Sequence, residues 1–348
     1  MDNKALIDKL NQQKCLTKEE FVSLLSSFQE SDRVYAAEVA RAIAERSFGK
    51  KIYIRGIIEF SNYCKNDCYY CGIRKSNKNA ARYRLSKEDI LFCCRKGYEL
   101  GFRTFVLQSG EDPYYTDEMM VDIISAIRKT YGDCAITVSV GEKSQESYEK
   151  YFAAGADRFL LRHETANADH YARLHPPELS FDRRFNCLYE LKEIGFQTGC
   201  GCMVGAPFQT MENLAEDMLF MADFKPQMIG IGPFIPHKDT PFKDFPAGSA
   251  PMTLFLLSLC RIMLPFVLLP ATTALGTISG EGRKQGVLAG ANVIMPNLSP
   301  AEVRSKYLLY DNKAFVGDDA AESVEMLKQH MAEIGYQLVT ERGDYQER

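Results

Sequence analysis

Eight short apolar segments alternate with longer helical windows after residue 50, and this alternation limits the fold more than any other feature. The segments begin at Ile52, Thr104, Ala135, Arg158, Gln197, Gln227, Phe266 and Asn292. The window after Ser86 is typical of the helices, since Ser86 is suited to cap its start and Gly101 to end it. Strands that alternate with helices form parallel sheets, and eight repeats predict an α/β fold, a complete (β/α)8 TIM barrel. An open doubly wound sheet is the alternative.

The chain contains no linker or low-complexity tract, so we expect a single domain over residues 1–348. Residues 1–49 form an N-terminal helical extension in this interpretation, with a capping box that begins at Thr17. Residues 50–300 form the barrel. Residues 301–348 form a C-terminal cap, with a helix over residues 318–334 and a polar tail.

Composition excludes several classes of partner. The net charge is −4, and no cluster of Lys and Arg is dense enough to follow a phosphate backbone, so we expect no nucleic-acid partner. Residues 252–271 are apolar and long enough to span a membrane, but Arg261, Pro265 and Pro270 interrupt them. We predict a buried helix, a turn and a barrel strand there, and no membrane association.

Cysteine usage indicates a reducing compartment. The chain has eleven cysteines, and its start lacks the apolar run of a signal peptide, so we expect a cytoplasmic protein. Eight of the cysteines are scattered through apolar surroundings and are expected to fill the core.

Polar residues stand where the apolar segments end. In a parallel barrel the carboxyl ends of the strands meet at one face, where the chemistry of such barrels is found. These residues should therefore converge on one pocket: Glu59, Gln108, Thr137, Ser139, Arg162, Glu164, Thr272, Thr273 and Asn297.

The remaining three cysteines, Cys64, Cys68 and Cys71, follow the first predicted strand directly. A structural zinc site usually closes with four ligands, and an electron-carrying [4Fe–4S] cluster needs four thiolates. Three thiolates leave one iron of such a cluster open to a small ligand. A zinc site of three cysteines and one histidine is the alternative, although the nearest histidine in the sequence is His163.

The C-x3-C-x2-C spacing after the first strand of a barrel resembles the radical S-adenosylmethionine (SAM) superfamily. The resemblance implies one [4Fe–4S] cluster on the catalytic, metal-binding residues Cys64, Cys68 and Cys71, with SAM on the unique iron. Reductive cleavage of SAM then gives a 5′-deoxyadenosyl radical. The residues that match the superfamily's cofactor site are Tyr70, Gln108, Ser109, Gly110, Glu164, Arg184 and Met203. Ser109 stands where the superfamily has a glycine, Glu164 is implied to bind the ribose and Arg184 the SAM carboxylate.

Longer blocks resemble the HydE family of [FeFe]-hydrogenase maturases. They include the segments E-F-S-N-Y-C-K-N-D-C-Y-Y-C-G, L-Q-S-G-E-D-P, F-L-L-R-H-E-T-A-N, G-P-F-I-P-H and P-A-T-T-A-L-G-T. The family is implied to use the radical on a cysteine-bound Fe(CO)2(CN) precursor, on the way to the diiron azadithiolate centre of the H-cluster. Its implied partners are the maturase HydG, which delivers the precursor, other hydrogenase maturases and a reducing electron donor.

An amino-acid substrate needs a cation and hydroxyl donors for its carboxylate. By the resemblance we assign this role to Arg162, Thr137, Ser139, Thr272 and Thr273, with Tyr307 and Tyr310 on the far wall. We expect His163 to point out of the barrel, because side chains alternate along a strand. Glu59 and Arg55 either point into the barrel or form a buried ion pair.

The chain has no cysteine after Cys260, whereas some HydE proteins bind a second cluster through C-terminal cysteines, so we expect one cluster. Two other functions stay open. One is a radical SAM mutase of an amino acid, similar to methylornithine synthase. The other is a non-enzymatic iron–sulfur carrier.

Overall fold

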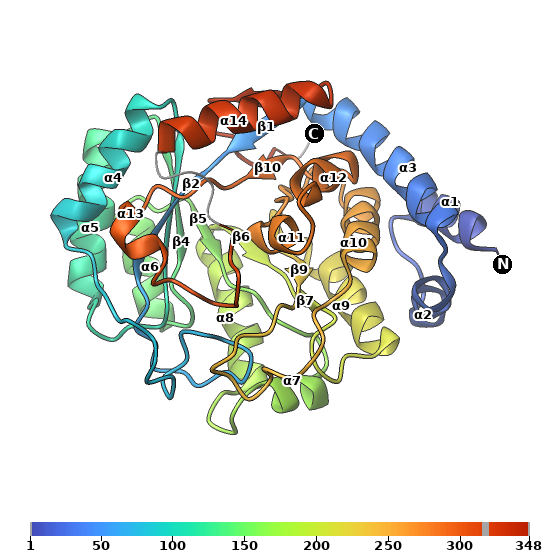
Figure 1. Cartoon of the computed structure of the whole chain (residues 1–348), viewed down its shortest axis with the longest axis horizontal. Coiled ribbons are helices and arrows are strands. Elements are labelled where there is room, and N and C mark those ends of the chain that lie inside the picture. The colour runs from blue at the N-terminus through green and yellow to red at the C-terminus, as the bar shows by residue number, and fades with distance from the viewer. Residues whose placement is uncertain (1, 315–319, 347–348) are drawn as a thin grey trace.

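The computed structural model describes residues 2–314 and 320–346, and its centre is a barrel of parallel strands inside a ring of helices (Figure 1). Arg55 divides the first predicted strand into two. The barrel strands are β1 (Lys51–Ile54), β2 (Gly56–Ser61), β3 (Thr104–Ser109), β4 (Ala135–Ser139), β5 (Arg158–Leu160), β6 (Gln197–Cys200), β8 (Met228–Ile229) and β10 (Val293–Ile294). Six of them form a parallel sheet in the order β2-β3-β4-β5-β6-β8.

The sheet closes on itself through the seventh predicted strand. Met228 of β8 bridges to Leu268, Pro270 bridges to Val293 of β10, and β10 pairs with β1. Pro270 has no N–H to donate, which limits the ladder of this seventh segment to isolated bridges. The prediction of a complete eight-stranded barrel is confirmed. A short pair above it, β7 (Met203–Val204) and β9 (Gly232–Pro233), extends the mouth.

From β2 onward, helices connect the successive barrel strands, and the longer ones cover the outside of the barrel. The helices after β2 are α4 (Lys87–Glu99), α5 (Asp117–Thr130), α6 (Gln145–Ala153), α7 (Ala168–Leu174), α8 (Phe181–Ile194), α9 (Met211–Phe224), α10 (Ala250–Met263), α11 (Thr273–Ile278), α12 (Gly282–Leu288), α13 (Ala301–Arg304) and α14 (Ala320–Glu333). Ser86 caps α4 as predicted, with its side chain accepting from the N–H of Asp89. Residues 318 and 319 of the helix expected over 318–334 lie outside the described residues.

Three N-terminal helices lie outside this ring: α1 (Asn3–Gln13), α2 (Lys18–Ser27) and α3 (Glu30–Phe48). Helix α2 packs against α9, while α1 and α3 pack against α10 (Figure 1). The capping box at Thr17 is present at the start of α2. The extension therefore covers the side of the barrel and leaves both ends of it uncovered.

The apolar segment around Arg261 forms a helix, a turn and the seventh strand segment, as the sequence predicts. Arg261 is fully buried at the end of α10. Its guanidinium donates to the carbonyl oxygens of Gly290 and Pro265, both at 2.8 Å, and to the Asn292 side chain at 3.1 Å. Among the described residues, no helix combines the length and the apolar character that crossing a membrane requires.

The C-terminal tail closes the lower end of the barrel, where the strands begin. Strand β11 (Gln337–Val339) pairs with β1, a strand that the sequence did not predict. Beyond it, the tail brings Asp344 to within 2.6 Å of the fully buried Arg158. Arg158 also donates to the carbonyl oxygens of Arg342 and Gly343, at 3.0 and 3.1 Å. The tail thus forms the floor of the barrel and is held there by its ion pair and hydrogen bonds with Arg158.

Candidate functional site

A cavity of about 360 Å³ opens at the carboxyl ends of the barrel strands. All the site residues predicted from the sequence line it except Thr273. Thr273 instead begins α11, where the neighbouring Thr272 caps the helix and also faces the cavity. The expected convergence of strand-end residues is observed for six of the nine, and the three that do not line the cavity are Glu59, Thr273 and Asn297.

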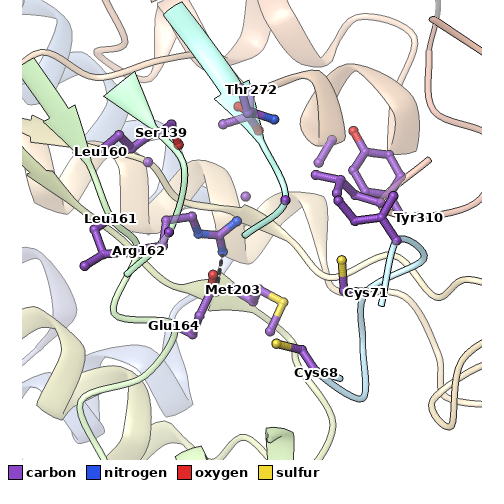
Figure 2. Close-up of a pocket in the computed structure, with 18 of the residues that line it drawn as sticks. Cys68, Cys71, Ser139, Leu160, Leu161, Arg162, Glu164, Met203, Thr272 and Tyr310 are labelled. Carbon is purple, nitrogen blue, oxygen red and sulfur yellow. Dashed lines mark ion pairs between the residues drawn. The ribbon is translucent and has the colours of Figure 1, made fainter. Parts of the chain in front are cut away.

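Cys64, Cys68 and Cys71 lie in the loop between β2 and α4 and line one side of the cavity. Figure 2 shows the sulfur atoms of Cys68 and Cys71 across the cavity from Ser139. Arg74 holds the loop from behind through Asp67, with its Nε 2.7 Å from Oδ1. Burial raises the pKa of the Cys71 thiol to about 12, so a thiolate at this position requires a positive charge beside it.

The three thiols fit a cluster better than a single metal ion. Among the described residues, one group of three candidate ligands has its donor atoms within 4.8 Å of one another, and it is His163, Cys202 and Asp217. At least one pair of the loop thiols is further apart than that. Burial, and then the neighbouring Cys71 and Cys64, raises the pKa of Cys68 well above its usual value, so the three thiols are still close to one another. Thiolates that bind different irons of one cluster are spaced in this way, whereas the ligands of one ion meet at a point.

Gly110 allows the cysteine loop to lie directly against the end of β3. A β-carbon at Gly110 would come within 2.2 Å of the Tyr63 carbonyl oxygen and 2.8 Å of the Cys64 Cβ. The N–H of the next residue, Glu111, points at the Cys64 sulfur at 3.4 Å. The turn expected to bind a cofactor amino group is therefore packed against the cysteine loop.

Tyr70 is fixed by a buried histidine that the sequence did not reveal as part of the site. The His175 Nδ1 lies 2.9 Å from the Tyr171 carbonyl oxygen, so this nitrogen carries the proton. Its Nε2 then accepts from the Tyr70 hydroxyl at 3.1 Å. Burial lowers the pKa of His175 to about 3, which keeps the ring neutral. The pair sets the position of the Tyr70 ring beside Cys71.

Arg184 is buried in a network of carboxylates. Its Nε lies 2.8 Å from Glu142 Oε1, and its Nη2 lies 3.9 Å from Glu111 Oε1. Burial by itself would lower the pKa of Arg184, but Glu142, Tyr171 and Glu111 together outweigh it and raise the pKa well above its usual value. An isolated arginine at the start of a helix is usually exposed to solvent, but Arg184 is buried.

Arg162 and Glu164 both face the cavity from the end of β5 (Figure 2). Glu164 has a φ of 66°, a left-handed conformation that non-glycine residues seldom adopt. Arg162 Nη2 lies 3.1 Å from Glu164 Oε2, but their orientation does not make a hydrogen bond. Arg162 Nε and Nη2 and Glu164 Oε2 have no hydrogen-bond partner among the described residues.

Further unpaired groups lie deeper in the same cavity. The Thr137 hydroxyl has no partner in the described part of the chain, and neither have Nε and Nη2 of Arg55. The third nitrogen of Arg55 lies 3.1 Å from the Met228 sulfur, and no acidic side chain is its partner within the described ranges. Buried polar atoms rarely stay unpaired, so these groups indicate a place for a ligand.

The segment after α13 covers one side of the mouth. The Tyr307 hydroxyl accepts from Gln108 Nε2 at 3.3 Å, and Tyr310 lies on the same wall. Lys313 holds this segment down through a buried ion pair with Glu59, whose other oxygen accepts from Asn297 at 2.8 Å. The hypothesis of an ion pair between Glu59 and Arg55 is therefore wrong, since Glu59 pairs with Lys313 instead. Residues four apart on a strand are also separated by about 13 Å, too far for an ion pair.

Sequence reasoning missed Glu142 and His175, and it gave Glu111 no role of its own. Glu142 and His175 lie in loops, and neither stands at the end of a predicted strand. Glu111 stands directly after Gly110 in the quoted turn, and its position was the one available signal. His163 lies outside the cavity, as alternation predicts.

Comparison with known proteins agrees with this geometry. The model of the radical SAM superfamily matches residues 58–221. The chain is 45% identical over 316 residues to the [FeFe] hydrogenase maturase subunit HydE of Thermotoga maritima, a match that covers 91% of this chain and 90% of that protein. It is 31% identical to the 3-methylornithine synthase of Methanosarcina acetivorans, over 81% of this chain and 80% of that one.

Solved structures give the same fold. The crystal structure of methylornithine synthase (PylB) superposes with a TM-score of 0.81 at 25% identity and covers 96% of this chain and 97% of the other. The maturase HydG superposes with a TM-score of 0.79 at 22% identity, over 96% of this chain and 75% of the other. The chain is a radical SAM enzyme and belongs to the family of the [FeFe]-hydrogenase maturase HydE.

Proposed function

We propose that this enzyme carries out a radical step in the assembly of the H-cluster of [FeFe] hydrogenase. Its substrate is a cysteine-bound Fe(CO)2(CN) unit, which is converted toward the diiron azadithiolate centre. The identity to the HydE maturase over nine-tenths of the chain supports the pathway. The chemistry of the cavity supports the class of substrate.

The cofactor end of the cavity suits one [4Fe–4S] cluster and SAM. Cys64, Cys68 and Cys71 hold the cluster, and reduced cluster with bound SAM supplies a 5′-deoxyadenosyl radical. The strand-end turn Gln108, Ser109 and Gly110 receives the amino group of SAM. The chain has no cysteine after Cys260, which supports a single cluster.

Three further side chains orient the cofactor in this proposal. Glu164 accepts hydrogen bonds from the ribose hydroxyls, Arg184 attracts the carboxylate, and Met203 forms the wall between Glu164 and the cysteine loop (Figure 2). Tyr70, fixed by His175, covers the cluster side. Together these groups limit the positions that the adenosyl group can take.

One observation supports the choice of substrate. Most of the unpaired polar atoms in the cavity are hydrogen-bond donors, and they belong to cationic or neutral side chains. The donors belong to Arg55, Arg162, Arg184 and Thr137, whereas Glu164 is the one carboxylate with an unpaired oxygen in the described lining. An anionic cysteine–iron complex can pair its carboxylate with Arg162 and the hydroxyls of Thr137, Ser139 and Thr272. Tyr307 and Tyr310 close the wall opposite.

A radical SAM mutase of a basic amino acid is the alternative, supported by the similarity to methylornithine synthase. Such a substrate carries an ammonium group at the end of its side chain, which requires a carboxylate in the pocket. Glu111 is already paired with Lys65 at 3.2 Å, and Glu164 faces Arg162. The charge of the cavity therefore favours the organometallic substrate.

The proposed partners follow from the substrate and from the need for an electron. HydG delivers the precursor, other hydrogenase maturases receive the product, and a reducing protein supplies the electron for each cleavage of SAM.

The experiment that tests the function uses the reconstituted enzyme with SAM, dithionite and a synthetic cysteine-bound Fe(CO)2(CN) complex. We expect the carbonyl and cyanide infrared bands of the complex to change as 5′-deoxyadenosine forms. A parallel reaction with lysine, the straight-chain isomer of methylornithine, is expected to give no methylornithine. Conversion of lysine with an unchanged iron complex would establish the mutase instead.

A further inference from the structure

The end of β5 is tied to α9 by a buried polar network that lies outside the cavity. Asp217 of α9 is 1% exposed, and His163, three residues after the end of β5, is 0% exposed. The His163 Nε2 lies 3.2 Å from Asp217 Oδ1, and the Gly201 N–H donates to His163 Nδ1 at 3.2 Å. The network therefore joins the ends of β5 and β6 to the helix behind them.

With Cys202, these two residues have the ligand types of a metal site, but their hydrogen bonds contradict that function. Since Nδ1 of His163 accepts the Gly201 N–H, it carries no proton. The ring proton is then on Nε2, which donates to Asp217 and has no lone pair for a metal. His163 is a hydrogen-bonding link between Gly201 and Asp217.

The same carboxylate also holds the other side of the Glu164 turn. Asp217 Oδ1 accepts from the Ala166 N–H at 2.5 Å, so one oxygen bonds the residues just before and two positions after Glu164. The Glu164 N–H donates to the Gly201 carbonyl oxygen at 3.0 Å. These bonds surround a residue whose φ of 66° is unfavourable for a side chain with a β-carbon.

The burial of Asp217 requires an explanation beyond packing. Its second oxygen, Oδ2, has no partner among the described residues, and a buried carboxylate with an unpaired oxygen is destabilising compared with an apolar residue. Helix packing alone would be better served by a leucine. This destabilisation is explained if the carboxylate determines the conformation of the turn. A residue stays in the left-handed conformation where its surroundings enforce it.

We propose that Asp217, acting through His163 and the Ala166 backbone, is a positioning residue that holds Glu164 in its left-handed conformation and so directs its carboxylate into the cofactor site. This inference rests on the proposed role of Glu164 as the acceptor for the ribose of SAM. Asp217 itself does not line the cavity.

The test is a double-mutant cycle on the affinity of the reconstituted enzyme for SAM, measured by titration of the electron paramagnetic resonance signal of the reduced cluster. We expect Asp217→Ala and Glu164→Gln each to weaken SAM binding by about tenfold. In the Glu164→Gln background, Asp217→Ala should have no further effect, because both changes remove the same interaction. Asp217→Asn keeps the accepting oxygen and should stay close to the wild-type affinity.

Multiplicative effects of the two substitutions, or wild-type affinity in Asp217→Ala, would overturn the inference. If Asp217→Ala does not fold, His163→Phe replaces it, since a phenyl ring preserves the contact with Phe220 but cannot bond Asp217 or Gly201. Its effect should likewise vanish in the Glu164→Gln background, and persistence of the effect there would contradict the proposal. A wild-type enzyme that binds no SAM would be seen first in the same titration, and it would refute the proposed function together with the inference.

Discussion

Arg158 and Arg162 begin and follow the same short strand, but their surroundings are opposite. Arg158, at the lower end of the barrel, is bonded by Asp344, by two carbonyl oxygens of the tail and by the Thr104 hydroxyl at 3.1 Å. Arg162, at the upper end, has two nitrogens without a hydrogen-bond partner in the described part of the chain. About 13 Å of extended chain therefore separates an arginine that is fully hydrogen-bonded from one with two unpaired nitrogens.

This difference shows that stability and function are located at opposite ends of the barrel. A buried ion pair with all its hydrogen bonds fixes a structure, whereas unpaired buried donors are expected where a ligand completes them. The lower end is therefore a floor, and the upper end is a binding site. Substitutions at the upper end should therefore change the chemistry, and substitutions at the lower end should change the stability of the fold.

The largest effect is expected at the upper end from Cys68→Ala. Removal of one of three thiolates should abolish both cluster binding and formation of 5′-deoxyadenosine, while the fold persists. Iron content and product analysis measure the two losses. Cys15→Ala, in the half-buried stretch between α1 and α2, is the matched control and should retain both. A Cys68→Ala enzyme that still cleaves SAM would contradict the assignment of the chemistry to the upper end of the barrel.

A smaller loss is expected from Gly110→Ala. The new β-carbon would lie 2.2 Å from the Tyr63 carbonyl oxygen, so the cysteine loop must move away from β3. Iron content and SAM affinity should both fall, with little change in the circular dichroism spectrum. Gly132→Ala is the control, because the nearest atom to its β-carbon is 3.9 Å away. Equal iron contents in the two variants would show that the loop tolerates the displacement.

The two arginines themselves give the next test, on the free energy of unfolding. Arg158→Ala leaves Asp344 without its buried partner and should reduce that free energy by about 3–5 kcal/mol. Arg162→Ala should change it by less than about 0.5 kcal/mol, because the side chain is partly exposed and its Nε and Nη2 have no hydrogen-bond partner among the described residues. Denaturant titration measures both values. Arg162→Ala should still cleave SAM but leave the iron complex unchanged, and similar losses of stability in the two variants would contradict the distinction.

The smallest effect concerns pH at the floor. Burial would raise the pKa of Asp344, but Arg158 and Arg342 outweigh it and hold the pKa below its usual value. The stabilisation from this carboxylate is therefore fully present above the unfolded pKa of about 3.9 and is lost as the pH falls through the lower folded value. The difference in unfolding free energy between the wild type and Asp344→Asn should shrink below about pH 4. A difference that stays constant from pH 7 to pH 3 would show that the charge of Asp344 does not matter.

The sequence predicted the upper end of the molecule much better than the lower end. Apolar segments locate the strands, and the carboxyl ends of parallel strands must meet, so residues such as Thr137 and Arg162 could be placed together. Cys64, Cys68 and Cys71 are close in sequence and needed no knowledge of the fold. Local spacing and topology together determine this part of the site.

The floor and the outer contacts could not be predicted because they join distant residues that share no pattern. Nothing in the sequence indicates that Asp344 accepts a hydrogen bond from Arg158, or that Glu142 forms an ion pair with Arg184. The same limit explains the wrong pairing considered for Arg55 and Glu59, since neither actual partner of Glu59 is near it in sequence. Thr273 was misplaced for a different reason: it begins the short helix α11, which the sequence analysis did not predict and which Thr272 caps.

The most direct test of the account is spectroscopic, on anaerobically reconstituted and reduced enzyme with and without SAM. Three thiolates at the open end of the barrel should hold four irons, and added SAM should change the electron paramagnetic resonance signal. Tightly bound zinc, or a four-iron signal that is the same with and without SAM, would contradict the claim that this end of the barrel is a radical SAM site.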